Sequence, residues 1–195
     1  MLAPTEPSPA ASRLLGFLNT RADGAGAVER FADAELFHAW AIEHAPAAGA
    51  DEVTEADLHA ARQLRDALVA LSLVHSRDTA VTPEEIRAAE ALLESWAPRY
   101  PIRAFVRVDG VELSSLQNGF PGLLGSVLAA VADLSLAGRW PRLKACLNER
   151  CQKSFYDRSR NSSAAYCSSG CSSQAAMRTL RQRQREQPSK RASAE

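Results

Sequence analysis

All four cysteines of this 195-residue chain lie within 26 residues, at Cys146, Cys151, Cys167 and Cys171. They form two close pairs, C-x4-C and C-x3-C, separated by a gap of 15 residues. A tetrahedral zinc site needs thiolate sulfurs at about 2.3 Å from the metal, and two local pairs joined by a loop allow a short chain to supply four of them. The spacing therefore predicts one Zn²⁺ ion held by all four cysteines.

Three other uses of four close cysteines stay open at this point. Two disulfides would suit a secreted chain, although we find no secretory signal in the sequence. An iron–sulfur cluster accepts the same four thiolates, and four unrelated free thiols would require a coincidence of position. We favour zinc, and because four sulfurs leave no open coordination position, we expect it to be structural rather than catalytic. Metal binding would stabilise a segment that has few apolar residues.

Charge is divided unevenly along the chain, although its formal net charge is zero. Residues 1–138 contain 10 Lys and Arg against 19 Asp and Glu, a net charge of −9, whereas residues 139–195 contain 13 against 4, a net charge of +9. Such an asymmetry indicates two functional units, of which the basic one faces a polyanion.

Five arginines of the basic part are candidates for contact with nucleic-acid phosphates. Arg178, Arg181 and Arg185 fall on one face of a helix that we expect over residues 172–186, and Arg158 and Arg160 lie in the loop between the cysteine pairs. Guanidinium groups on a rigid helix suit phosphate contacts, which give affinity without sequence information. The alternative is a charged helix that is merely solvated.

The elements that must position this module are mostly helical. We expect a helix capped by Ser12, a second from near Asp33, and a long third helix that follows the capping box at residues 54–57 and runs to about Ser76. Thr82-Pro83 indicates another helix start. A β-hairpin is expected near 102–116 with a tight primed turn at Asp109-Gly110, and a last buried helix should end at Gly138.

The predicted fold class is therefore mainly α with one small β-hairpin. We divide the chain into a disordered leader at 1–12, a helical domain at 13–138, a small zinc-finger module of four cysteines ending in a basic helix at 139–186, and a disordered tail at 187–195. The most apolar run, 122–138, is interrupted by Asp133 and is too short to cross a bilayer, so we expect no membrane partner and a cytoplasmic location.

Residues of both parts resemble known families. Arg142-Leu-Lys-Ala-Cys146, Cys151, the segment 155–161 (Phe-Tyr-Asp-Arg-Ser-Arg-Asn) and Tyr166-Cys-Ser ahead of Cys171 resemble the CGNR zinc finger. Residues 17–21 (Phe-Leu-Asn-Thr-Arg) resemble the opening of the ABATE domain, which commonly precedes this finger. This chain departs from the finger in its naming tetrapeptide, which reads Cys-Ser-Ser-Gln at 171–174.

The resemblance implies a stress-induced transcription regulator of bacteria in which the four cysteines bind zinc and the finger binds DNA. It also implies that Asn19, Thr20 and Arg21 could adjoin a ligand pocket, so that the helical domain senses a small-molecule effector or forms a homodimer. The alternative is a zinc-stabilised protein-interaction module that does not bind DNA. We find no P-loop, dinucleotide fingerprint or Ser/His/Asp signature, and we do not expect an enzyme.

Overall fold

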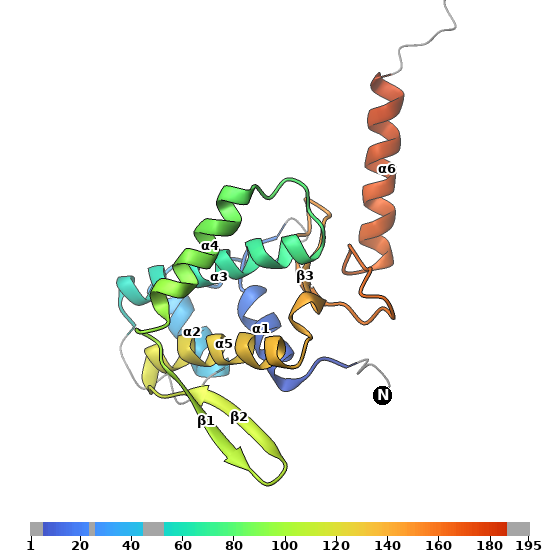
Figure 1. Cartoon of the computed structure of the whole chain (residues 1–195). Coiled ribbons are helices and arrows are strands. Elements are labelled where there is room, and N and C mark those ends of the chain that lie inside the picture. The colour runs from blue at the N-terminus through green and yellow to red at the C-terminus, as the bar shows by residue number, and fades with distance from the viewer. Residues whose placement is uncertain (1–5, 24–25, 45–52, 187–195) are drawn as a thin grey trace, which may run out of the picture.

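The computed structural model describes residues 6–23, 26–44 and 53–186. Within these ranges the chain forms six α-helices, one 3₁₀ helix (η2, Trp140–Arg142) and two antiparallel sheets of two strands each. The prediction of a mainly α fold with a small β content is confirmed (Figure 1). The second sheet, which belongs to the cysteine-rich part, was not predicted.

Five helices build the N-terminal body around an apolar core. They are α1 (Pro9–Leu18), α2 (Ala34–His44), α3 (Glu55–His75), α4 (Pro83–Trp96) and α5 (Gly119–Leu136). Aromatic rings from three of these helices and the loop before α2 meet in the core, with centroid separations of 4.6–6.3 Å. The rings are those of Phe17, Phe31, Phe37, Trp40 and Phe120. This cluster fixes how α1, α2 and α5 cross.

Local sequence signals set most helix ends. Thr54 with Asp57 and Thr82 with Glu85 form reciprocal capping boxes at the starts of α3 and α4. The first box and the helix start at Thr82 were predicted from the sequence. After α5, Gly138 adopts a φ of +65°, and the Arg139 amide donates to the Leu134 carbonyl at 2.8 Å. This is the Schellman ending for which glycine is suited, because a side chain disfavours positive φ.

Two boundaries differ from the sequence prediction. Helix α1 begins at Pro9 rather than after Ser12, because Ser8 caps it and Ala10 and Ala11 are buried in the core. Residues 9–12 therefore belong to the fold and not to a disordered leader. Residues 1–5 of that leader and the predicted tail at 187–195 lie outside the described residues.

The predicted hairpin is present as β1 (Ile102–Arg107) and β2 (Gly110–Ser115), and it extends away from the helical body (Figure 1). Arg107 pairs with Gly110, so the two turn residues are Val108 and Asp109, neither of which has positive φ. The predicted primed turn at Asp109-Gly110 is therefore wrong by one residue. The base of the hairpin packs on α5, where Gly125 lies so close to Ser115 that a Cβ at position 125 would clash with the Ser115 Oγ.

Helix α5 is long and apolar enough to cross a membrane by its length and composition alone. Half of its 18-residue span is buried within this fold. Leu124, Val127 and Leu134 are fully buried in the core that it shares with α1 and α3. Its apolar character is thus accounted for by the core of this body.

The second sheet joins the cysteine-rich part to the helical body. Strands β3 (Leu143–Ala145) and β4 (Ser154–Tyr156) pair in antiparallel fashion, and Leu143 and Tyr156 belong to the same hydrophobic core as the helices. The Ala145 amide donates to Ser76 Oγ at 3.1 Å, and His75 Nδ1 donates to the Leu143 carbonyl at 2.8 Å. Burial holds the pKa of His75 below its ordinary value, so this ring is neutral at pH 7.

The end of α1 makes a second connection between the helical body and the cysteine-rich part. The side chain of Asn19 donates from Nδ2 to the Ser154 carbonyl at 3.0 Å and accepts from the Ser154 amide at 2.8 Å. It thereby pairs with the backbone of β4 as a neighbouring strand would. Arg21 donates to Gln152 Oε1 at 2.6 Å, two residues before β4. The two parts of the chain are therefore fastened at residues far apart in the sequence.

We predict that Asn19→Ala lowers the free energy of unfolding by about 1–3 kcal/mol, because the backbone amide and carbonyl of Ser154 lose both partners. Asn118→Ala is the matched control, since Asn118 precedes α5 without a side-chain cap and should change stability by less than about 0.5 kcal/mol. Urea unfolding followed by circular dichroism measures both. Equal stability of the two variants would contradict this role for Asn19.

Candidate metal centre

Each cysteine of the predicted site comes from a different local element. Cys146 follows β3, Cys151 lies in the turn between β3 and β4, Cys167 lies in the loop before α6 (Ser169–Glu186), and Cys171 is in the first turn of α6. Their four Sγ atoms all lie within 4.8 Å of one another. The β3–β4 ribbon therefore supplies one pair and the start of α6 supplies the other.

This arrangement fits one structural zinc ion. Sulfurs bound at about 2.3 Å to a tetrahedral ion are about 3.8 Å apart. The Cys151–Cys167 and Cys167–Cys171 Sγ pairs are both 3.6 Å apart, and all four thiols are free. A disulfide would require about 2.05 Å, so the geometry excludes the two-disulfide alternative. Zinc would hold the ribbon to α6, and with four sulfurs it would offer no site for substrate.

Burial and mutual proximity disturb the thiol pKa values. Burial is the largest influence on Cys151 and Cys167, and it raises the pKa of both above the ordinary value. Burial also acts on Cys171, but hydrogen bonds from Ser168 and Asn148 outweigh it and lower the pKa of Cys171 to about 7. Ser168 caps α6 by accepting the Cys171 amide at 3.2 Å. A thiolate at this position also benefits from the positive end of the helix.

A buried ion pair holds the loop that carries Cys167 toward the ribbon. Lys144 on β3 donates from Nζ to Asp157 Oδ2 at 2.7 Å, and both side chains are almost completely buried. Asp157 also accepts the amides of Ser159 and Ala164. Burial would raise the pKa of Asp157, but these partners lower it below its ordinary value, so the carboxylate stays ionised. Asp157 is therefore structural.

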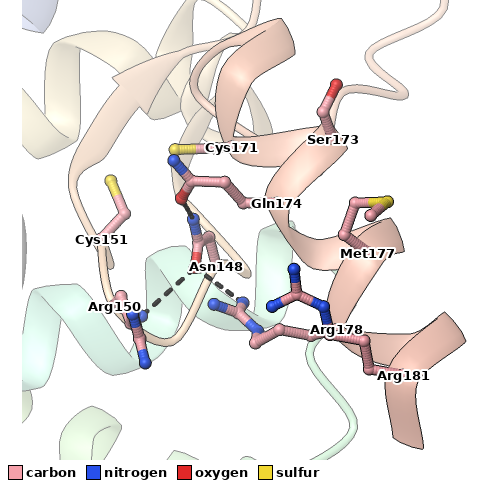
Figure 2. Close-up of a pocket in the computed structure, with 9 residues that line it drawn as sticks. All are labelled: Asn148, Arg150, Cys151, Cys171, Ser173, Gln174, Met177, Arg178 and Arg181. Atoms are coloured by element: carbon pink, nitrogen blue, oxygen red, sulfur yellow. Dashed lines mark hydrogen bonds between the residues drawn. The ribbon is translucent and has the colours of Figure 1, made fainter.

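Asn148 connects the cysteine turn to α6 (Figure 2). It is 1% exposed, its Nδ2 donates to Gln174 Oε1 at 3.0 Å, and its Oδ1 accepts from Arg178 Nη2 at 2.7 Å. Its carbonyl accepts the Cys151 amide at 2.7 Å. Sequence reasoning missed this residue. Its place inside the C-x4-C turn is the only signal in the sequence, because its side-chain partners on α6 lie 26 and 30 residues away.

A groove of about 600 Å³ runs between this turn and α6. Arg150, Arg178 and Arg181 line it together with the polar residues Asn148 and Gln174 (Figure 2). Arg178 and Arg181 were predicted, whereas Arg150 was missed because it lies inside the cysteine turn. Nothing in its spacing indicated that it would face α6.

The other predicted arginines lie elsewhere. Arg158 and Arg160 are exposed on the loop at 157–164, and Arg158 lines a different hollow beside β4. Arg185 is exposed beyond the groove, toward the end of α6. The structure therefore gathers two of the five predicted arginines in one groove and leaves three outside it.

Comparison with protein-family models finds two matches along the chain. Residues 142–184 match the model described as "CGNR zinc finger", and residues 11–138 match ABATE, described as "Putative stress-induced transcription regulator". The second match covers about two thirds of the chain. This protein belongs to the ABATE family. A search of curated proteins found no match.

The opening segment of the ABATE domain makes contacts within the protein. Thr20 is 1% exposed, donates to the Phe17 carbonyl at 2.7 Å and accepts from the buried guanidinium of Arg65. Asn19 and Arg21 hold Ser154 and Gln152, as described above. The space that Asn19 and Arg21 line measures only about 110 Å³. Asn19 and Arg21 therefore connect the helical domain to the zinc-finger part, whereas Thr20 is held inside the helical domain. That these three residues adjoin a ligand pocket stays a prediction.

We predict that the protein binds one zinc ion per chain and that Cys146→Ser loses it, which elemental analysis measures. Zinc needs thiolates, and the raised pKa values of Cys151 and Cys167 mean that metal binding must displace protons. Zinc affinity should therefore fall as the pH is lowered from about 8 to about 5. A chromophoric chelator reports the release. Zinc retention that is independent of pH would contradict four-thiolate ligation.

We predict that Asp157→Asn lowers stability by about 3–5 kcal/mol, because Lys144 is left as an unpaired buried charge. The double variant Lys144→Met with Asp157→Asn should recover part of that loss, since no unpaired charge remains. Arg87→Met is a control, because Arg87 pairs with Glu84 on the surface of α4 and contributes little. A double variant less stable than Asp157→Asn alone would contradict the ion-pair argument.

Proposed function

We propose that this protein is a transcription regulator that binds DNA through the arginine groove beside its zinc site. The observation that carries the proposal is the convergence of Arg150, Arg178 and Arg181 on one groove whose two walls are joined at the zinc centre. Guanidinium groups held in a fixed arrangement suit the oxygens of a phosphate backbone. Phosphate contacts would position the finger on the duplex.

Helix α6 supports this proposal by its exposure. Each of its residues from 169 to 185 is at least partly exposed, so this stretch adds nothing to a hydrophobic core. A helix with so little packing of its own is consistent with a partner-binding role, and its groove side carries Arg178 and Arg181. It extends outward from the body (Figure 1), and at about 1.5 Å per residue it is about 27 Å long. An isolated α-helix of this kind fits the major groove of DNA.

The finger's naming tetrapeptide ends in arginine, which this chain lacks at position 174, but a nearby arginine supplies a positive charge on the same face. Gln174 occupies the position of its final arginine, and Arg178 lies one helical turn further along the same face. Gln174 and Arg178 both bind Asn148, so Arg178 is oriented by the cysteine turn. We infer that Arg178 takes over the cationic role at this surface. A regulator with reduced thiols and DNA as its partner would act in the cytoplasm, and we propose no enzymatic activity.

The exposed apolar residues of α6 favour a second candidate. Met177 and Leu180 are each 50% exposed, and Leu180 faces away from Arg178 on the helix. A zinc-stabilised module that binds another protein, or a second copy of this chain, through this face is the alternative. In that case Leu180→Gln would abolish association in analytical ultracentrifugation, and the zinc-loaded protein would not bind DNA.

We predict that the zinc-loaded protein binds a labelled DNA duplex of mixed sequence, with an affinity that falls by about one log unit per log unit of salt for each phosphate contacted. Arg178→Gln with Arg181→Gln should reduce that slope by about two. Fluorescence anisotropy at several salt concentrations measures it.

Arg183→Gln is the matched control, because Arg183 lies on the opposite face of the same helix and its substitution removes one positive charge, as each groove substitution does. Arg183→Gln should change the salt slope by clearly less than Arg178→Gln or Arg181→Gln does alone. An equal effect would show that the net charge of α6, and not the groove, attracts DNA. Absence of binding at low salt would refute the proposal.

A further inference from the structure

A second cavity lies in the ABATE domain and shares no lining residue with the arginine groove. It measures about 410 Å³ and is formed by α1, α2, β2 and the first half of α5. This volume falls in the range of about 300–1,000 Å³ that small-molecule sites occupy. The cavity is therefore large enough for a ligand of modest size.

One wall of the cavity is apolar and aromatic. Phe17, Trp40, Leu123 and Val127 contribute to it. The ring of His44 stacks on Trp40 with a centroid separation of 4.7 Å and an angle of 16°, and His44 Nδ1 donates to the Trp40 carbonyl at 3.0 Å. The hydrogen bond fixes the imidazole in place. The cavity thus has a rigid wall against which the body of an apolar ligand can pack.

The polar groups of the lining favour an anion. Arg13 on α1 is exposed and has no ion pair or hydrogen bond within the part of the chain that the structure describes. Glu112 is the one carboxylate in the lining, and Arg107 already pairs with it at 3.2 Å. Among the cavity's charged groups, the guanidinium of Arg13 is therefore left without a counter-charge.

Two neutral groups in the lining also lack partners. The buried Oε1 of Gln117 accepts no hydrogen bond from the described residues. Asn118 precedes α5 without capping its first turn. A buried amide oxygen without a partner destabilises a fold. Rotation of the Gln117 amide in the presence of a ligand would give Oε1 a partner and would turn the Nε2 group toward the ligand as a hydrogen-bond donor.

We propose that this cavity binds a small carboxylic acid with an aromatic or branched apolar body. The carboxylate pairs with Arg13, whose guanidinium can hold both oxygens, and the apolar body packs against Trp40 and Leu123. The site would give the regulator proposed above its effector, but its occupancy does not depend on DNA binding. The test therefore contains no DNA.

The zinc-loaded 195-residue chain is titrated with three probes: phenylacetate, 3-methylbutanoate and the neutral isostere phenylacetamide. Isothermal titration calorimetry and Trp fluorescence report binding, since Trp40 lies in the wall. We expect at least one carboxylate to bind with a Kd of about 1 mM or tighter, and phenylacetamide to bind about tenfold more weakly than phenylacetate. If neither carboxylate binds, or the amide binds equally well, the proposal is wrong.

Variants locate the site. Arg13→Gln should weaken carboxylate binding by about tenfold without lowering the thermal midpoint, because Arg13 is exposed and pairs with no group in the described part of the chain. Ser126→Leu on α5 fills the cavity and should abolish binding. Arg87→Gln, on α4 and outside the cavity, is the charge-matched control and should bind as the wild type does. Wild-type affinity in folded Arg13→Gln would overturn the proposal even if Ser126→Leu fails to fold.

Discussion

The position of α6 depends on one zinc site of four cysteine sulfurs, one of which comes from the first turn of this helix. No residue of α6 between 169 and 185 is fully buried, so packing alone does not fix the direction of this helix. Cys171 in its first turn shares the site with Cys146 and Cys151 on the ribbon, and Asn148 adds two hydrogen bonds to α6. The arginine groove exists only while these links hold, because its two walls come from different segments of the chain. Structural zinc would thus hold the two walls of this cationic groove together.

The ribbon that carries this site is part of the helical body. Leu143 and Ala145 are fully buried against α3, and Asn19 pairs with the backbone of β4. We expected zinc to compensate for a segment with too little apolar surface. In the structure, the core of the ABATE domain buries much of the apolar surface of this segment. Zinc would then mainly connect α6 to the β3–β4 ribbon. A displacement at the end of α1 would therefore reach β4 directly, through hydrogen bonds rather than through a flexible linker.

The charge distribution has a structural counterpart. The acidic residues lie mostly in the helical body, whereas four arginines belong to α6, a helix that extends away from that body (Figure 1). A polyanion would be repelled by the body and attracted by the helix, so extension of α6 separates two surfaces of opposite charge. Lys144 is excluded from this surface because Asp157 neutralises it in the interior. The count of basic residues consequently overstates the charge that a partner would meet.

The sequence alone indicated the zinc ligands, because the close pairs C-x4-C and C-x3-C are recognisable as one pattern across the 15-residue gap. It also indicated the helix starts at Thr54 and Thr82 and the glycine ending at Gly138, because each of these depends on residues within a few positions of one another. It did not determine the roles of Asn19, Asn148 or Lys144. The partners of these residues lie 135, 26–30 and 13 residues away, and only the folded chain brings them together. The β3–β4 ribbon escaped prediction for the same reason, since three-residue strands have no periodicity of their own and are positioned by packing, of β3 on α3 and of β4 on α1. Tertiary structure likewise decided which arginines share the groove.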